Sequence, residues 1–364
     1  MAAGTPQYEY IRAKEFSLPV LTNYSECYVE LGVIGEGTFG NVVMARRIKD
    51  GLIVAIKSVR IYSKHLLDNV RKAMREVVII KKLANVDVPI IYDQFLRYNE
   101  AKQLLFSIVM EYIEGGNMEL VFQNFIQTMN LGSGAGRQRQ RTFLQQFVPW
   151  LYQNLNNMHQ QGIVHRDIKP SNIMYRSNPL PGQSLYVLVD LGFGCVVEGL
   201  KTLRVSPGLF KRKVAGIKVD DLNDIMRQID QTCETDRFIG TVIYLPPEAF
   251  SDEEGFVPNL RSYDIWAAAV VLHEFIHLEP IFTPDNADSA NLDQMIAEYA
   301  EEVNIPITCR YIPPYDRIVM ESTSLESSLR PSAAQIFDFL TAWAGGIFLT
   351  EIRPESFNQI YLEH

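Results

Sequence analysis

Five polar side chains lie close together between Ile163 and Met174, where the sequence is IVHRDIKPSNIM. They are His165, Arg166, Asp167, Lys169 and Asn172. This mixture suits neither one face of a helix nor an alternating strand, and Pro170 prevents a regular helix. We therefore predict a loop that apolar residues fix at both ends. Its carboxylate, cation and amide are groups that phosphoryl transfer requires: one to orient a hydroxyl, one to neutralise phosphate charge and one to hold a metal.

Three glycines at GxGxxG spacing could bring the backbone close to phosphate groups. They are Gly35, Gly37 and Gly40. The spacing alone is weak evidence, because dinucleotide-binding folds use it in front of a helix. Here strand-like residues stand on both sides, at 27–31 and 42–45, and a turn at 50–51 leads into a return strand at 53–57. The context favours a glycine loop in an antiparallel hairpin.

Lys57 ends the apolar return strand, where an ammonium without a partner would be costly. The segment 70–83 has apolar residues at helical spacing and carries Glu76, 19 residues beyond Lys57. We predict an ion pair between Lys57 and Glu76. The alternative is that Glu76 is a solvated helix charge, because Lys72 and Arg75 are its neighbours.

Further strands are predicted at 90–96, 104–110 and 185–189. The last of them ends at Asp190-Leu191-Gly192, and a carboxylate at the end of a buried strand is well placed to bind Mg²⁺ between phosphates. Further helices are predicted at 118–129, 143–160, 264–278, 285–303 and 332–344. The apolar run at 265–272 indicates a buried helix and is too short to span a membrane.

The glycine hairpin, Lys57 with Glu76, the loop at 163–174 and the Asp190 triplet follow one another along the chain. In this order they resemble the motifs of the eukaryotic-type protein kinases, serine/threonine branch. The resemblance covers roughly residues 28–345. It implies an α+β, bilobal fold with a small antiparallel β-sheet N-lobe, one main helix in that lobe, and a larger, mainly helical C-lobe. The expected divisions are an N-terminal extension (1–25), an N-lobe (26–112), a C-lobe (113–345, with the activation segment at 190–248) and a tail (346–364).

The resemblance implies ATP-dependent phosphoryl transfer to serine or threonine hydroxyls of proteins. Asp167 would be the base, and Lys169 would stabilise charge on the phosphoryl group. Thr241 would bond both. Asn172 and Asp190 would bind Mg²⁺, or Mn²⁺ in its place. The implied ATP-binding residues are Gly35, Glu36, Gly37, Thr38, Phe39, Gly40, Val42, Ala55, Lys57, Met110, Glu111, Ile113 and Met174.

Structural pairs are also implied by the resemblance. Glu248, in the segment that closes the activation loop, would pair with Arg330, and Asp264 would hold the backbone of the catalytic loop. The family's usual triplet has Phe where this chain has Leu191. Leucine still offers an apolar side chain to pack with His165 and Ile80.

The stretch between Asp190 and Glu248 is 58 residues long, longer than such loops usually are. Apolar spacing predicts a helix within it at 219–229, which either regulates the active cleft or is a passive surface elaboration. The resemblance implies phosphorylation of the 193–239 loop, by an upstream kinase or by the chain itself. The candidate positions are Ser206, Thr232 and Thr235.

Composition limits the remaining choices. The chain has 364 residues and a formal net charge of −9, which disfavours nucleic acid as the main partner. Its four cysteines show no metal-binding spacing, so we expect free thiols and an intracellular, cytoplasmic protein. Cys195 is either a reactive thiol or a small packed residue. The cysteines are Cys27, Cys195, Cys233 and Cys309.

Two segments have no clear period. Residues 1–25 predict a loose lead-in; the alternative is an ordered extension packed through Phe16, Leu18 and Val20. The glycine- and arginine-rich stretch 131–141 predicts an exposed linker, whose arginines could instead bind an acidic partner. For the whole chain, the alternatives to a protein kinase are a pseudokinase-like nucleotide-binding scaffold and a kinase of small molecules.

Overall fold

The computed structural model describes residues 4–13, 16–37, 40–62, 66–128, 133–197, 239–250, 259–278 and 312–346. The chain divides into two compact units. Unit 1 consists of Met1–Leu83, Val88–Gly115 and Arg176–Cys233, and unit 2 of Ala84–Asp87, Gly116–Tyr175 and Glu234–His364. The helices expected at 219–229 and 285–303 lie outside the described residues.

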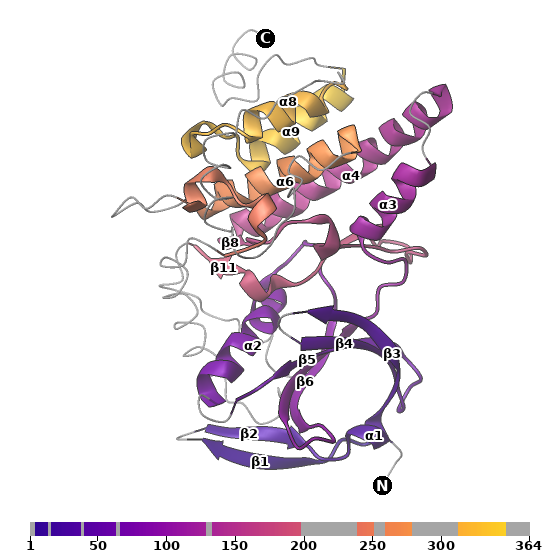
Figure 1. Ribbon diagram of the computed structural model, residues 1–364, viewed down its shortest axis with the longest axis vertical. Coiled ribbons are helices and arrows are strands. Elements are labelled where there is room, and N and C mark those ends of the chain that lie inside the picture. The colour runs from indigo at the N-terminus through magenta and orange to yellow at the C-terminus, as the bar shows by residue number, and fades with distance from the viewer. Residues whose placement is uncertain are drawn as a thin grey trace, which may run out of the picture. The chain divides into compact units, whose positions relative to one another are not determined.

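Unit 1 is built on a seven-stranded sheet with the order β1-β2-β6-β7-β5-β4-β3 (Figure 1). Neighbouring strands are antiparallel except for β2 and β6, which are parallel. The strands are β1 (Tyr8–Ala13), β2 (Phe16–Leu21), β3 (Tyr28–Gly37), β4 (Gly40–Arg47), β5 (Ile53–Arg60), β6 (Ile91–Tyr98) and β7 (Leu104–Glu111). The other elements are α1 (Tyr24–Cys27), α2 (Leu66–Lys82), β10 (Tyr186–Leu188), η3 (Leu191–Phe193) and β11 (Cys195–Val196).

Two apolar clusters cover the two faces of this sheet. The first joins α2 to β5, β6 and β7 through buried residues such as Met74, Leu96 and Ile108. The second lies on the opposite face and includes Ile56 and Phe95. Alternating strand residues therefore feed two separate cores, as the two-residue period of a strand requires.

The N-terminal residues are ordered, so the expectation of a loose lead-in is wrong. Strands β1 and β2 pair as a hairpin, and Val20 of β2 lies opposite Leu96 of β6. Val20 is only 3% exposed. The hairpin is hard to predict from the sequence. Strands that join an existing sheet need only a few apolar residues, and the partner strand is about 75 positions away.

Unit 2 is mainly helical. Its helices are α3 (Met118–Thr128), α4 (Gly134–Gln160), α6 (Leu260–His277), α8 (Tyr315–Ser322) and α9 (Ala333–Ala344). Its short elements are β8 (Ile163–Val164), η2 (Pro170–Asn172), β9 (Ile173–Tyr175), η5 (Val242–Tyr244), η6 (Pro247–Phe250) and η8 (Ser327–Leu329).

Helix α6 forms the centre of unit 2, with α4 and α8 packed against it and α9 packed against α4 (Figure 1). Almost all of its residues are buried, polar ones such as Asp264 and Glu274 included, and Trp266 near its middle has no exposed surface. An aromatic group made of Phe122, Phe143, Phe147 and Phe275 joins α3, α4 and α6. The buried helix predicted from the apolar run is confirmed.

Helix α4 begins earlier than predicted, so residues 134–141 form a helix and not a linker, although most of them are exposed as expected. The side chain of Ser133 caps the helix by accepting from the amide of Gly136. One turn further, the Gln140 side chain is buried and donates to the carbonyls of Phe275 and Ile276 at 3.0 and 2.7 Å. These anchors outweigh the low helix propensity of the glycines.

Cysteine usage also differs from the expectation. Cys27 is a free, buried thiol, but Cys195 is disulfide-bonded. Pairing depends on which cysteines the fold brings together, and the sequence spacing did not reveal it. None of the described helices is long and apolar enough to cross a membrane.

Candidate active site

The glycine loop lies in the predicted hairpin, between β3 and β4. Gly37 pairs with Gly40, and Gly35 with Val42. Gly40 has φ of +139°, and a Cβ there would stand 1.9 Å from the carbonyl oxygen of Ser58. Only glycine fits this position. Thr38 and Phe39, at the tip of the loop, lie outside the described residues.

Lys57 bridges two carboxylates in unit 1. Its Nζ donates to Glu76 Oε2 on α2 and to Asp190 Oδ1, both at 2.7 Å. Exposed fractions are 13% for the Lys57 side chain and 6% for that of Glu76. Burial alone would lower the pKa of Lys57, but the charges and hydrogen bonds of Glu76 and Asp190 outweigh it and raise the pKa. The ammonium is therefore held charged, and Glu76 is not the solvated helix charge of the alternative interpretation.

Asp190 follows β10 and has a left-handed backbone, with φ of +61°. Its side chain is 35% exposed, so it remains accessible to a ligand while it bonds Lys57. The next residue, Leu191, is completely buried, and its 3₁₀ turn lies against α2. Leucine thus fills the position of the family's phenylalanine.

The expected adenine-binding residues of β4, β5 and β7 meet in one cluster. Ala55 pairs with Met110 across the sheet, and Val42 packs against the α2-side cluster that contains both of them. The amide of Glu111 donates to the carbonyl of Ile90, which leaves the carbonyl of Glu111 as the group it could offer to a base. Ile113, two residues on, is 6% exposed.

Arg176 fixes this end of β7, and sequence reasoning missed it. Its guanidinium donates to Glu111 Oε1 through both Nε and Nη2, at 3.1 and 2.7 Å, and to the carbonyl of Ser184 at 3.0 Å. A two-pronged bond of this kind orients a carboxylate firmly. The only sequence signal is an arginine beside an apolar strand, 65 residues from its partner.

In unit 2, Asp264 of α6 holds the backbone of the catalytic loop. Its carboxylate accepts from the amides of His165 and Arg166 at 2.9 and 2.8 Å, as the resemblance implies. Burial alone would raise the pKa of Asp264, but the hydrogen bond and charge of His159, with the contribution of His165, lower it instead. His159, whose Nε2 lies 2.9 Å from Asp264, was not singled out from the sequence because its partner is 105 residues away.

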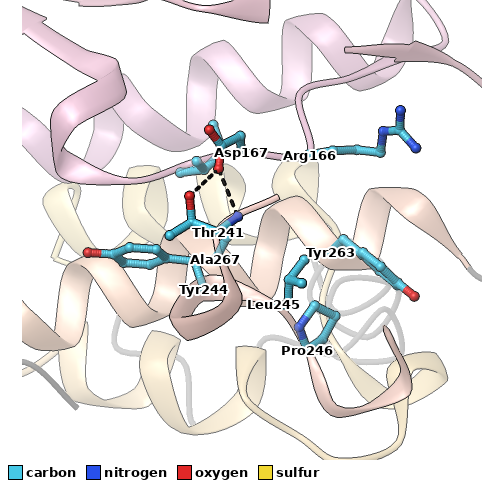
Figure 2. Close-up of a pocket in the computed structure, with 9 residues that line it drawn as sticks. Arg166, Asp167, Thr241, Tyr244, Leu245, Pro246, Tyr263 and Ala267 are labelled. Atoms are coloured by element: carbon cyan, nitrogen blue, oxygen red, sulfur yellow. Dashed lines mark hydrogen bonds between the residues drawn. The ribbon is translucent and has the colours of Figure 1, made fainter. Parts of the chain in front are cut away.

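The Asp167 carboxylate accepts three hydrogen bonds and pairs with one cation. The amide and hydroxyl of Thr241 donate to Oδ1 at 3.0 and 2.7 Å, and Figure 2 shows the carboxylate facing Thr241. Asn172 Nδ2 donates to Oδ2 at 2.7 Å, and Lys169 Nζ lies 2.9 Å from Oδ2. Lys169 Nζ also donates to the Thr241 hydroxyl at 2.7 Å. The structure thus brings together the unit 2 residues that the sequence analysis selected.

Gly240 allows the approach of Thr241 to the loop. Its φ is +135°, and a Cβ would stand 2.6 Å from the carbonyl oxygen of Arg166. Beside this contact is a small cavity of about 10 Å³, room for about one water molecule. Its lining residues are Arg166, Asp167, Ile168, Thr241, Tyr244, Leu245, Pro246, Tyr263 and Ala267 (Figure 2). The segment that carries Thr241 is therefore closely packed against the loop of Asp167, and the cavity is too small for a substrate.

Tyr244, which lines this cavity, is hydrogen-bonded to a buried carboxylate, that of Glu274. The Tyr244 hydroxyl lies 3.3 Å from both carboxylate oxygens of Glu274. Burial raises the pKa of Glu274 to about 7, the hydrogen bond from Tyr244 lowers it, and the charge of Glu119 raises it further. Sequence reasoning missed Glu274 because it lies within the apolar helix α6, where a lone acid looks incidental.

The expected pair of Glu248 and Arg330 is present as a two-pronged bond, with distances of 2.6 and 2.7 Å. The Arg330 side chain has no exposed surface and stacks over the ring of Trp266. Met174 pairs through its backbone with Asn117. Among the described residues, no group of three or more His, Cys, Asp or Glu could hold a metal.

Comparisons with known proteins agree with this geometry. A model described as "Protein kinase domain" matches residues 28–339. The chain is 27% identical to serine/threonine-protein kinase Nek8 of Danio rerio over 85% of its length, covering 36% of that protein. It is 26% identical to serine/threonine-protein kinase Nek1 of Mus musculus over 86% of its length (21% of that protein). It is 27% identical to serine/threonine-protein kinase SSK22 of Saccharomyces cerevisiae over 70% (16% of that protein). The chain thus spans about a third or less of these relatives.

Proposed function

Because the chain belongs to the protein kinase family, we propose that it transfers the γ-phosphoryl group of ATP to serine or threonine hydroxyls of protein substrates. The observation that carries the proposal is the arrangement around Asp167, where Lys169, Asn172 and Thr241 all bond one carboxylate. A buried carboxylate flanked by a cation is suited to orient a hydroxyl and accept its proton beside a phosphoryl group.

Unit 1 would bind the nucleotide. The Lys57 ammonium, held charged by Glu76 and Asp190, would grip the α- and β-phosphates, and the amides of residues 35–40 would cover them. Val42, Ala55 and Met110 would enclose the adenine, with Met174 as a further apolar contact. The carbonyl of Glu111 and the amide of Ile113 would bond its edge.

Asn172 and Asp190 would hold the magnesium ion. Both supply oxygen, the donor that Mg²⁺ prefers, and Mg²⁺ commonly takes only one or two protein carboxylates together with phosphate oxygens. The partly exposed carboxylate of Asp190 fits that use. When bound, the ion neutralises charge on the β- and γ-phosphates.

Unit 2 would carry the transfer. The substrate hydroxyl oxygen forms a bond to the γ-phosphorus, the bond from that phosphorus to the β–γ bridging oxygen breaks, and ADP leaves. Asp167 accepts the hydroxyl proton, and Lys169 donates to the transferring phosphoryl group. Thr241 is bonded to both side chains and would hold them in fixed positions relative to each other. This lysine and threonine support the serine/threonine branch.

The proposal is tested by incubating the purified chain with γ-³²P-labelled ATP, Mg²⁺ and a generic protein substrate, beside an Asp167→Asn control. Acid-stable label on serine or threonine that is lost in the control supports it. Tight Mg-ATP binding with no transfer would favour the pseudokinase-like scaffold instead. Label on the chain itself would identify autophosphorylation, and its absence unless a second kinase is added would indicate an upstream activator.

A further inference from the structure

The N-terminal hairpin β1–β2 is anchored firmly to unit 1. Beyond the pairing of β2 with β6, Asn23 ties the start of the chain to the end of β2. Its Nδ2 donates to the carbonyl of Thr5 at 2.9 Å, and its Oδ1 accepts from the amide of Gln7 at 2.8 Å. The amide of Thr22 also donates to the carbonyl of Gln7 at 3.0 Å. The hairpin is therefore closed at its base as well as along its strands.

The two faces of the hairpin enter different cores. Val20 and Ile11 join the cluster on the α2 side of the sheet, whereas the adjacent Leu21 and its strand partner Tyr8 join the cluster on the other side. Val20 and Leu21 are equally buried, each 3% exposed. Only one face of the hairpin can therefore act on α2.

The residues of α2 that share this cluster flank Glu76 in the helix. Val70, Met74, Val77 and Val78 are all buried in it, and Glu76 lies between Met74 and Val77 in the sequence. The 2.7 Å contact of Glu76 with Lys57 depends on where α2 sits on the sheet. Because a helix moves as a rigid element, apolar contacts on one face fix the position of a side chain on the neighbouring face.

We propose that the β1–β2 hairpin is a built-in brace for α2, with Val20 and Ile11 as positioning residues that hold Glu76 on Lys57. Neither residue would touch ATP or substrate; both would act through the helix. The inference rests on the proposed kinase function for its effect on rate, but the bracing of α2 can be measured without any activity.

The first test compares Val20→Ala with Leu21→Ala in the full chain. The two changes remove apolar volume from adjacent, equally buried positions on opposite faces, so both should lower the melting temperature. Only Val20→Ala should lower kcat, by about tenfold, as expected for truncation of a buried valine that stabilises the active arrangement. It should also raise KM for ATP, because Lys57 would grip the phosphates. Val20→Ile, which keeps the apolar contact, should retain most of the activity.

Hydrogen exchange of the amides of α2, residues 66–82, gives the readout that does not depend on catalysis. Exchange should be faster in Val20→Ala and unchanged in Leu21→Ala. Equal effects of the two variants on kcat, with α2 exchange unaltered in both, would overturn the brace and leave the hairpin as a stabilising extension of the sheet. If the wild type transfers no phosphate even after a second kinase is added, the proposed function fails, and the exchange experiment still decides the brace.

A double-mutant cycle with Glu76→Gln tests the route of the effect. If Val20 acts through Glu76, the fall in kcat caused by Val20→Ala should disappear when Glu76 is already replaced. An effect of Val20→Ala that multiplies with that of Glu76→Gln would show that Val20 acts by another route and would contradict the proposal.

Discussion

The carboxylate of Asp167 is fully occupied. Oδ1 accepts from the amide and hydroxyl of Thr241, and Oδ2 accepts from Asn172 and pairs with the Lys169 ammonium. Each oxygen thus has two partners, which is about the capacity of a carboxylate oxygen. A substrate hydroxyl must therefore displace one of these donors. The hydroxyl of Thr241 is the donor that can leave without moving the backbone, because it rotates about one side-chain bond and can still bond Lys169.

Replacing Thr241 with valine tests this exchange. The variant keeps the shape and the backbone amide but removes the hydroxyl that bonds Asp167 and Lys169. We expect kcat to fall by about 10- to 100-fold, the size of a lost hydrogen bond to a charged group, because Lys169 loses the hydroxyl that it would still bond after the exchange. The KM for ATP should be unchanged. Thr241→Ser should recover most of the rate. A valine variant as fast as the wild type would show that the hydroxyl does not organise the base.

Glu274 predicts a pH dependence of stability. Its pKa is 4.5 as an ordinary side chain and about 7 in the folded protein, so the folded state keeps a proton that the unfolded state releases. The contribution to stability is complete below pH 4.5 and is lost as pH rises through about 7; it corresponds to about 3 kcal/mol. Urea unfolding measured across this range should show a smaller fall in the free energy of unfolding for Glu274→Gln than for the wild type.

The control for this measurement is Glu100→Gln, which removes an exposed carboxylate. It should leave the slope of stability against pH as in the wild type. An identical slope in Glu274→Gln would mean that Glu274 is ionised throughout and that Tyr244 and Glu119 do not face a protonated group.

At the scale of elements, the segment that carries Thr241 meets the catalytic loop at Gly240. Replacement of Gly240 with alanine would put a Cβ 2.6 Å from the Arg166 carbonyl oxygen, so the segment must move away and the bonds from Thr241 to Asp167 lengthen. We expect kcat to fall by about 100-fold, the effect of a displacement of about 1 Å in an active site. Gly182→Ala, at a positive φ but in open space, should keep the wild-type rate; equal rates for the two variants would contradict the close approach.

The pair of Glu248 and Arg330 joins η6 to the turn before α9. Arg330→Lys would lose one prong of the bond and the stacking over Trp266, and we expect it to lower the free energy of unfolding by about 2–4 kcal/mol. The matched control is Arg317→Lys, whose partner Glu321 lies on an exposed part of α8 and whose loss should cost less than about 0.5 kcal/mol. Similar losses in both variants, measured by urea unfolding, would contradict the structural role of the buried pair.

For the whole molecule, the chemistry could be predicted from the sequence because the relevant residues stand in short local patterns. The loop around Asp167, the glycine hairpin and Asp190-Leu191-Gly192 each fall within about a dozen positions. Lys57 and Glu76 were paired correctly because a strand followed by a helix leaves few choices of partner. Strands β3 to β7 and the buried helix α6 likewise followed from period and apolar length.

The contacts that could not be predicted join distant parts of the chain. Arg176 finds Glu111, and His159 finds Asp264, only after folding. The glycine-rich start of α4 was misjudged because Gln140 is anchored by a helix more than 130 residues away. The N-terminal hairpin was misjudged for the same reason, since β6 supplies its partner strand. Local propensity carries no information about such tertiary anchors.

Lys57 and Asp190 would bind the nucleotide, whereas Asp167 would accept the proton of the substrate hydroxyl. The most direct measurement is the dissociation constant of Mg-ATP and the rate of phosphoryl transfer, taken on the same preparations of Asp167→Asn and Asp190→Asn. Asp167→Asn should bind Mg-ATP as the wild type does and transfer about 1,000-fold more slowly, whereas Asp190→Asn should lose Mg²⁺-dependent binding as well. Transfer by Asp167→Asn at the wild-type rate would contradict the account.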